Sequence, residues 1–309
     1  MAKAAGTFDL HAQITDRIVA AIEAGAGEFV MPWHRKDMPG GFPVNASTGK
    51  AYRGINILSL WLAASEAGFA TNKWATFKQW LDMGATVRKG EKGSLITYYK
   101  TIEREDEEDE DGEGRSKRGM FAKPSWVFNA AQVTGFADEA PREAAGQTVE
   151  LIEAADAAIR ATLADIRHGG SEAFYNRARD FIQVPEGSAF VGSKTSTAQE
   201  AYYSVILHEL AHWSGAEARL NREKGKKFGD KPYAFEELIA ELAAAFQCAE
   251  LGITNEPRLD HAQYIAGWLK ALKDDRRAIF LAASAASAAT DYILNFSRTG
   301  NAGERWQAA

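Results

Sequence analysis

The sequence predicts an α+β protein of two domains, a small α+β domain followed by a mainly helical domain with a small sheet. Its 309 residues are enough for two domains of ordinary size. Apolar residues recur at helical spacing through most of the second half, whereas the longest strand-like segments lie before residue 136. Between the halves, residues 137–147 (ADEAPREAAGQ) carry little hydrophobic content, so we expect a linker there.

The predicted first domain, residues 1–136, contains three helices and two strands. Helices are expected over 8–24, 55–67 and 76–84, the last ending at Gly84. The segments GSLITYYKTIE and KPSWVFNAAQVTG are typical of strands. Residues 103–118 between them form a charged, low-complexity loop, for which disorder at the tip is the expectation.

The predicted second domain covers residues 148–299 and is followed by a tail, residues 300–309. A helix is expected near 149–166, then short strands within 172–185 and 187–192. Further helices are expected around 202–215, over 233–250, and twice within 259–295. This order of mostly helical segments with a few short strands predicts a helical domain that carries only a small sheet.

Composition and charge limit the setting. The single cysteine, Cys248, excludes an internal disulfide framework and favours a reducing compartment. The first residues have no apolar signal core, and no uninterrupted apolar run reaches membrane-spanning length, so we expect a cytoplasmic protein without a membrane partner. The net charge is −6, but residues 1–100 hold twelve Lys and Arg against eight Asp and Glu, whereas residues 103–113 hold nine acids and one Arg. Local sign, rather than the total, decides whether a polyanion is attracted.

The segment YYSVILHELAHWSG, residues 202–215, contains the strongest chemical signal. His208 and His212 are four residues apart on an otherwise apolar helix, so both imidazoles project from one face and can share a metal. Glu209 lies about 100° round the helix, where it can act on a water without ligating the metal. The alternative is a core helix with two satisfied histidines and a surface glutamate.

A zinc hydrolase of this kind needs a third protein ligand and one open position. Downstream, YAFEELIAELAAAF offers three glutamates. We predict that Glu237 ligates the metal and that Glu241, on the same helical face, accepts from a ligand histidine. Glu236 points elsewhere and is expected to be exposed or to cap the helix, although any of the three could be the ligand. The expected ion is Zn²⁺, with another divalent metal as an alternative.

The ordered motifs resemble those of the ArdC family of plasmid antirestriction proteins. The resemblance rests on PWHRK, NASTGKAYRGINILSL, WATFKQWLDMGATVRKGEKG and VFNAAQVTG in the first half, and on YYSVILHELAHWSG, AFEELIAEL and YIAGWLKALKDD in the second. It implies an N-terminal single-stranded-DNA-binding domain and a C-terminal zincin-like metallopeptidase domain. It also implies expression from a conjugative element and protection of incoming DNA from host restriction. The acidic run 103–113 is not part of the pattern.

Basic side chains interleaved with aromatic ones in the first half suit single-stranded DNA, because cations follow phosphates and rings stack on bases. No motif for sequence readout is present, so binding is expected to be largely independent of sequence. Trp61 and Trp80 are expected in the core, and Trp33 and Trp74 are divided evenly between core and stacking. The candidate DNA-binding residues are Trp33, Arg35, Lys36, Asn45, Ser47, Thr48, Tyr52, Arg53, Trp74, Lys78, Arg88, Lys89 and Lys92.

The expected chemistry is metal-assisted peptide hydrolysis with Glu209 as general base, acting on a host protein. Tyr264, His261 and Tyr203 are candidates for steadying the oxyanion. The strand FIQV, residues 181–184, is the candidate edge strand for an extended peptide. The alternative is a non-catalytic shield that covers DNA while the metal plays a structural role.

Overall fold

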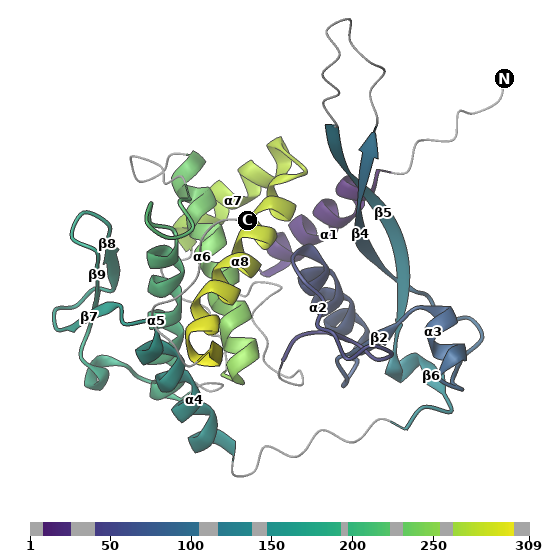
Figure 1. The fold of residues 1–309 in the computed structure, drawn as a ribbon, viewed down its shortest axis with the longest axis horizontal. Coiled ribbons are helices and arrows are strands. Elements are labelled where there is room, and N and C mark those ends of the chain that lie inside the picture. The colour runs from purple at the N-terminus through teal and green to yellow at the C-terminus, as the bar shows by residue number, and fades with distance from the viewer. Residues whose placement is uncertain are drawn as a thin grey trace, which may run out of the picture.

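The computed structural model describes residues 9–25, 41–104, 117–137, 147–192, 197–222, 231–253 and 262–299. The fold is α+β, as the sequence predicts. Figure 1 shows a small three-stranded sheet on one side, a central layer of helices, and a long β-hairpin on the other side. The acidic run and the C-terminal tail lie outside the described residues, apart from the two positions at the start of the run.

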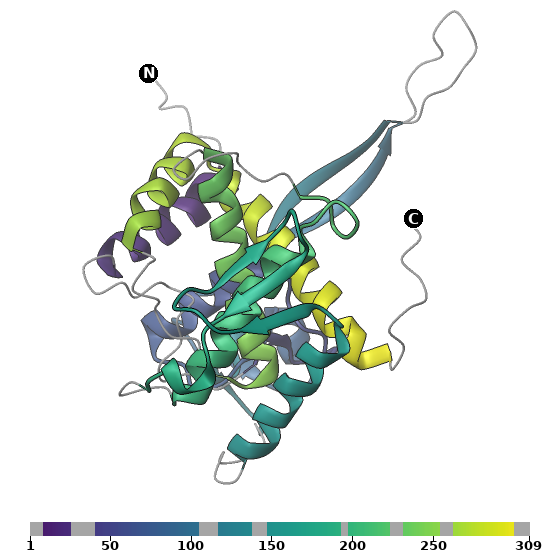
Figure 2. The same ribbon diagram turned by 90° about the vertical axis from the view of Figure 1, so that its left-hand side faces the viewer.

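The first half is built around a four-stranded sheet in the order β1-β2-β5-β4. The long strands β4 and β5 pair antiparallel as far as Arg104 opposite Lys117, so residues 103–104 and 117–118 belong to strands, whereas the sequence had placed them in a loop. In Figures 1 and 2 this hairpin projects away from the helices. The elements of this half are α1 (Leu10–Gly25), β1 (Val44–Asn45), α2 (Ile55–Ala67), β2 (Lys73–Ala75), α3 (Phe77–Asp82), β3 (Thr86–Val87), β4 (Ser94–Arg104), β5 (Lys117–Asn129), the 3-10 turn η2 (Ala130–Gln132) and β6 (Val133–Thr134).

Helix α2 covers the outer edge of strand β4. The Asn56 side chain donates to the Thr97 carbonyl and accepts from the Thr97 N–H, both at 2.8 Å. Ser59 Oγ donates to the Leu95 carbonyl at 2.8 Å. An uncovered edge strand would present unpaired backbone groups to other chains, and these side chains satisfy part of that edge.

The second half is mainly helical, with one three-stranded sheet. The strand order is β7-β9-β8, so FIQV is the middle strand and the prediction that it forms an edge is wrong. The expected helix over 149–166 ends at Ala161, and 187–189 form a 3-10 turn instead of a strand. The elements are α4 (Gln147–Ala161), β7 (Asp165–His168), β8 (Phe174–Asn176), β9 (Phe181–Val184), η3 (Gly187–Ala189), α5 (Ala198–Ser214), α6 (Lys231–Leu251), α7 (Ala262–Asp274) and α8 (Ala278–Thr299).

The two halves share one hydrophobic core. Side chains of α1 and α2 form a single buried cluster with side chains of α6, α7 and α8. At its centre, Trp61 meets Phe246 edge to face with ring centroids 5.7 Å apart. Polar groups join the same surfaces, because Thr15 Oγ1 donates to the Arg276 carbonyl at 2.7 Å and Ser287 Oγ accepts from the Gly54 N–H at 3.0 Å. Residues 138–146 of the expected linker lie outside the described residues, so the domain boundary stays a prediction.

Helix α8 is the one helix, among the residues that the structure describes, long and apolar enough to cross a membrane by length and composition. More than half of its apolar window, 56%, is buried inside the fold. Its buried face packs against α6, with Ala282, Ala286 and Ala289 fully enclosed. The small side chains let the two helices approach closely, so α8 behaves as a core helix of this fold.

Candidate functional site

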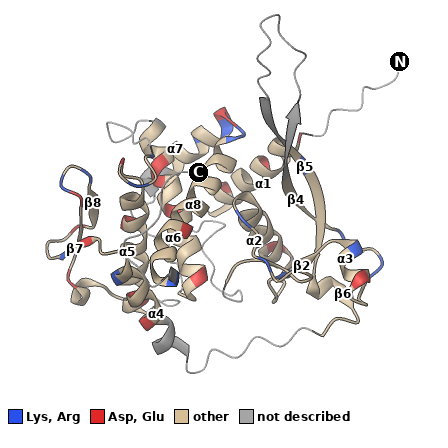
Figure 3. Cartoon of the chain, viewed as in Figure 1, with Lys and Arg blue, Asp and Glu red and all other residues tan. Residues whose placement is uncertain are grey.

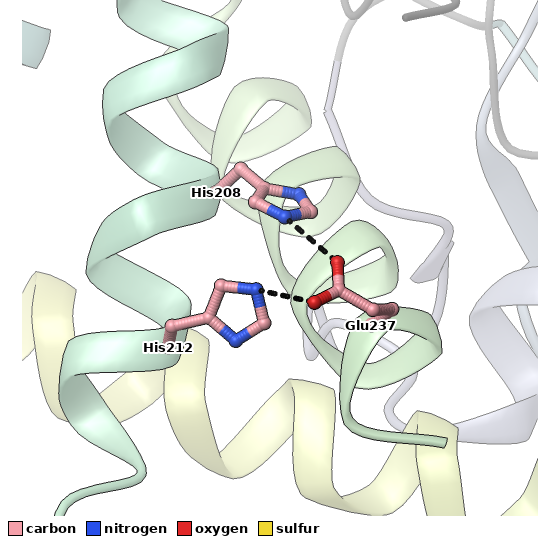
Figure 4. Close-up of side chains that lie close together, drawn as sticks. All are labelled: His208, His212 and Glu237. Carbon is pink, nitrogen blue, oxygen red and sulfur yellow. Dashed lines mark ion pairs between the residues drawn. The ribbon is translucent and has the colours of Figure 1, made fainter. Parts of the chain in front are cut away.

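Helix α5 carries the HExxH motif, and a capping box fixes the residue at which the helix begins. At its start, Thr197 Oγ1 accepts from the Glu200 N–H at 3.1 Å, and the Glu200 carboxylate accepts from the Thr197 N–H at 2.8 Å, which completes a capping box. Its central residues are buried almost all round. His208 and His212 point from α5 toward Glu237 on α6 (Figure 4).

Three side chains converge with the chemistry of a metal site. One donor atom from each of His208, His212 and Glu237 lies within 4.8 Å of the others. The two Glu237 oxygens lie 3.6 Å from His208 Nε2 and 3.5 Å from His212 Nε2. Ligands about 2.0–2.2 Å from a tetrahedral zinc ion are separated by about 3.4 Å, so the spacing fits one small divalent cation.

Glu209 follows His208 directly and is 3% exposed. It lies outside the group of three donor residues that the structure brings together. Because Glu209 is buried, the alternative in which it is a surface residue is wrong. Its predicted role as general base stays a prediction.

Glu236 belongs to the candidate site, although the sequence analysis placed it elsewhere. It is 3% exposed rather than a surface or capping residue, and its Oε1 lies 3.2 Å from His212 Nδ1. Arg222 donates to the same carboxylate from Nε at 3.1 Å and from Nη2 at 2.9 Å. A hydrogen bond to the second ring nitrogen of a metal-binding histidine fixes its tautomer, which leaves Nε2 facing Glu237.

Arg222 comes from the segment that follows α5, and the fold makes space for it. Its Nη1 donates to Ser214 Oγ at 3.0 Å and its Nη2 to the Ala211 carbonyl at 2.5 Å. A Cβ added to Gly215 would lie 2.8 Å from Arg222 Nη2, so a larger residue there would displace the guanidinium. Arg222 thus connects the end of α5 to the start of α6.

Glu241 lies on the other histidine. Its Oε2 is 3.6 Å from His208 Nδ1, and the residue is 2% exposed. Each histidine therefore has Glu237 near its Nε2 and a different glutamate near its Nδ1. At 3.6 Å the contact is within ion-pair distance but too long for a hydrogen bond, so the predicted acceptor role of Glu241 stays a prediction.

The site concentrates negative charge in a buried place. Glu209, Glu236, Glu237 and Glu241 are all buried, and Arg222 is the cation in contact with Glu236. Burial alone lowers the pKa of His212, but the carboxylates of Glu237 and Glu236 outweigh it and raise that pKa to about 9. Burial raises the pKa of Glu237, yet both histidines hold it far below its ordinary value. Buried carboxylates in this excess are stabilised by a bound cation.

Tyr203 is the one candidate for an oxyanion contact whose side chain the structure describes, and it lines a different part of the fold. Tyr203 lines a cleft between α4, β7 and α5 together with Asp156 and Arg160. His261 and the side chain of Tyr264 lie outside the described part of the chain. The oxyanion contact therefore stays unassigned.

The predicted DNA-binding residues separate into buried, structural and exposed groups. Trp74 is fully buried, so its predicted stacking role is wrong; Trp61 and Trp80 are buried as predicted. Asn45 Oδ1 accepts from the Ser47 and Thr48 N–H groups at 3.0 and 3.1 Å, and its Nδ2 lies 3.4 Å from Tyr52 Oη, so it organises the turn after β1. Burial raises the pKa of the half-buried Tyr52 to about 12.

The cationic candidates lie on the surface with different contacts. Arg53 pairs with Asp291 on α8, and Lys78 pairs with Asp82 at 2.9 Å within α3. Arg88 donates to Glu91 at 2.6 Å and to the Ala131 carbonyl at 2.7 Å, which ties the loop after β3 to η2. Lys89 and Lys92 are exposed on that loop, and Figure 3 shows basic residues in this region beside α3. Trp33, Arg35 and Lys36 lie outside the described residues.

An exposed aromatic residue that the sequence analysis missed is Trp126, which is 50% exposed on β5. The alternation of side chains along β5 could have identified it, because its neighbour Val127 is an apolar residue on the opposite face and is fully buried.

Each half of the chain matches a known protein family. The family described as the N-terminal domain of anti-restriction factor ArdC matches residues 8–128, and the family described as zincin-like metallopeptidases matches residues 153–285. The uncharacterized protein y4eC of Sinorhizobium fredii is 44% identical over 92% of this chain and 91% of its own length. Two proteins of Escherichia coli named DNA primase TraC are 37% and 35% identical, and this chain spans only 27% and 20% of their lengths.

Solved structures extend the similarity over almost the whole fold. The metal-free crystal structure of the antirestriction protein ArdC from plasmid R388 is 40% identical, with a TM-score of 0.76, over 94% of this chain and 99% of that chain. The Mn(II)-bound structure of the same protein is 39% identical, with a TM-score of 0.74, over 94% and 98%. The chain therefore belongs to the ArdC family of antirestriction proteins.

Proposed function

We propose that this protein is a cytoplasmic antirestriction factor with metal-dependent peptidase activity. In this proposal it binds single-stranded DNA and protects incoming DNA from host restriction. The observation that carries the peptidase part is the convergence of His208, His212 and Glu237, with Glu209 buried beside them as a non-ligating acid. A metal with a purely structural role needs no such base and normally closes its fourth position with protein.

The proposed reaction is hydrolysis of a peptide bond. His208, His212 and Glu237 would hold the ion, for which Zn²⁺ is the first candidate; Mn(II) bound to the R388 relative supports a divalent site. When bound, the ion supplies Lewis acidity that polarises the scissile carbonyl and acidifies water. Glu209 accepts the proton from the attacking water and transfers it to the leaving amine. Glu236 and Glu241 keep both imidazoles oriented with Nε2 toward Glu237.

A host protein is the proposed peptidase substrate. With β9 in the middle of its sheet, β7 and β8 are the edge strands of that sheet among the described residues. Strand β8 packs against α5, and Arg177, next to β8, donates to the Arg222 carbonyl at 3.4 Å. An extended peptide paired with β8 would therefore run close to the segment that carries Arg222.

Single-stranded DNA is the proposed partner of the N-terminal half. Support comes from the match to the ArdC N-terminal domain and from exposed side chains. The cation Lys92 lines a cleft together with the half-exposed ring of Trp126, and Lys89 is exposed on the same loop as Lys92. Aromatic rings that stack on bases and cations that contact phosphates together suit single-stranded DNA of any sequence.

The alternative is a shield that covers DNA without proteolysis. It is favoured by the burial of His208, Glu209, His212 and Glu237, which are 3–7% exposed and offer a peptide little access in this structure.

An antirestriction assay in cells distinguishes the two functions. Unmodified DNA is transferred into a restricting host that expresses the wild type or Glu209→Gln, a change that removes the base and preserves side-chain size. The peptidase model predicts that Glu209→Gln loses protection while the purified variant still binds one metal ion and DNA. Full protection by Glu209→Gln would instead support the shield.

A further inference from the structure

A cleft of about 700 Å³ lies in the N-terminal half, away from the metal centre. Its walls are α1, α2 and the segment 90–95, which runs from the loop after β3 into the start of β4, with Trp126 on β5 at one side. None of its lining residues belongs to α5 or α6. This volume is in the range of about 300–1,000 Å³ that is typical of small-molecule sites.

Trp126 is held so that its ring remains accessible in this cleft. It pairs with Leu95 of β4, and both residues line the cleft. Gly93 allows the neighbouring loop to lie against it, because a Cβ at that position would be 3.0 Å from Trp126 Cβ. A half-exposed indole on a rigid β-strand loses little conformational freedom when it binds a flat partner.

The charged residues that line the cleft, Arg17, Lys92, Glu66 and Glu91, sum to zero. Arg17 pairs with Glu66, which joins α1 to α2, and Glu91 accepts at 2.6 Å from Arg88 on the adjoining loop. Inside the cleft, the carboxylates of Glu66 and Glu91 would repel a phosphate but not an uncharged base. The exposed amide of Gln13 lines the same space and offers both a donor and an acceptor. Lys92 lines the cleft and is exposed, and Lys89 lies on the same loop.

We propose that this cleft takes an unpaired base of single-stranded DNA, stacked on Trp126, while Lys89 and Lys92 contact the phosphates beside it. The proposal rests on the proposed function, since it assigns the site at which that strand is read. The bases enter a neutral, partly aromatic cleft, and the charged backbone stays on its basic margin. Hydrogen bonds from Gln13 can adjust to different base edges, so binding does not depend on one sequence.

The test compares oligo-dT with an oligonucleotide of equal length that is mostly abasic and keeps the phosphates. Trp126→Leu in the full-length chain should weaken oligo-dT binding about 5- to 150-fold, which is the effect of losing one stacked base. Its affinity for the abasic strand should equal that of the wild type. Trp126→Phe keeps an aromatic ring, so its affinity for oligo-dT should lie between those of the wild type and Trp126→Leu.

Tyr98→Leu is the matched control. Tyr98 is also exposed, at 62%, on the same hairpin, but it pairs with Lys123 and lies an odd number of residues from Leu95, on the opposite face of the strand. It should change binding to neither strand by more than about twofold. Equal losses in Trp126→Leu and Tyr98→Leu, or equal losses on both oligonucleotides, overturn the assignment of the cleft.

The same experiment separates the inference from the function on which it rests. Wild type that binds neither oligonucleotide refutes single-stranded-DNA binding itself. Wild type that binds oligo-dT, with Trp126→Leu binding it equally well, refutes only the role of the cleft. Thermal unfolding of each variant should give a midpoint close to that of the wild type, because both replaced side chains are at least half exposed.

Discussion

Arg222 holds Glu236 through two hydrogen bonds, and Glu236 in turn contacts the Nδ1 of His212. The same guanidinium donates to Ser214 and to the Ala211 carbonyl at the end of α5. The orientation of His212, a candidate metal ligand, therefore depends on a residue ten positions later in the chain. This relationship makes Arg222 a positioning residue for the candidate metal site.

Arg222→Ala should weaken metal binding about 10- to 100-fold, because His212 loses the support of a correctly placed Glu236. Isothermal titration of metal-free protein with Zn²⁺ or Mn²⁺ measures the change. Arg222→Lys should recover only part of it, since an ammonium group cannot make the paired contacts of a guanidinium.

Arg219→Ala is the control for this prediction. Arg219 lies on the same segment and donates to the Trp213 carbonyl and to Asp180, without a contact to Glu236. It should lower the stability of the fold while metal affinity stays near the wild-type value. Equal losses of metal affinity in both variants would show that the segment acts only through stability.

The glutamates of α6 should differ in their effect on metal content. Glu237→Ala should lose most of the bound ion, since it removes a ligand, whereas Glu209→Ala should retain about one ion per chain. Glu236→Ala and Glu241→Ala should bind about 10- to 100-fold more weakly, because each supports one imidazole. Metal content by atomic absorption and affinity by chelator competition provide the measurement. An empty site in Glu241→Ala with a full site in Glu237→Ala would reverse the ligand assignment.

Lys89 and Lys92 should act through the phosphates. Replacing both with alanine should weaken binding to all single strands alike and reduce the salt slope by about 0.7 for each lost phosphate contact. A titration of oligo-dT affinity against salt concentration tests this. Lys78→Ala is the comparison, because Lys78 is paired with Asp82 in α3, and its slope should remain that of the wild type. An unchanged slope in the double variant would place the phosphates elsewhere.

Phe246→Ala should destabilise both halves together. Phe246 is fully buried against Trp61, and removal of such a ring costs about 3–5 kcal/mol. Because the cluster joins α2 to α6, hydrogen exchange should accelerate in α2 as well as in α6. The control is Ile182→Ala, a fully buried change in the other large cluster, which contains α5 and the small sheet. Protection of α2 that is unaltered by Phe246→Ala would mean that the halves unfold independently.

The convergence of His208, His212 and Glu237 could be predicted because the information for it is largely local. The spacing of His208 and His212 and the apolar helix around them fix both side chains on one face. The same reasoning failed for Glu236, since it assumed that α6 has a solvent face. The segment from 234 to 249 is apolar nearly all round and is buried, so each glutamate in it needed a partner. The partner of Glu236, Arg222, lies in a polar segment whose sequence is typical of a solvated loop.

Features that depend on pairing between distant segments were less predictable. FIQV has the composition of any buried strand, and only its neighbours β7 and β8 make it central. Trp74 follows a loop, which left it equally suited to core or surface, and its pairing with Asn129 of β5 places it inside. The shared core likewise could not be predicted from residues 137–147. The composition of a connecting segment suggests where a boundary lies, but it does not show whether the two halves that it joins pack against each other.

The common core also explains which piece of sequence can move between proteins. A boundary drawn between the halves would strip α1 and α2 from α6, α7 and α8 and expose apolar faces on both fragments. A longer protein would therefore have to acquire both halves together to keep these faces covered. The primase relatives fit this expectation, since their similarity runs across 93% of this sequence and occupies about a quarter or a fifth of their own. Recombination would thus transmit the candidate metal site and the N-terminal cleft together, with their relative geometry preserved.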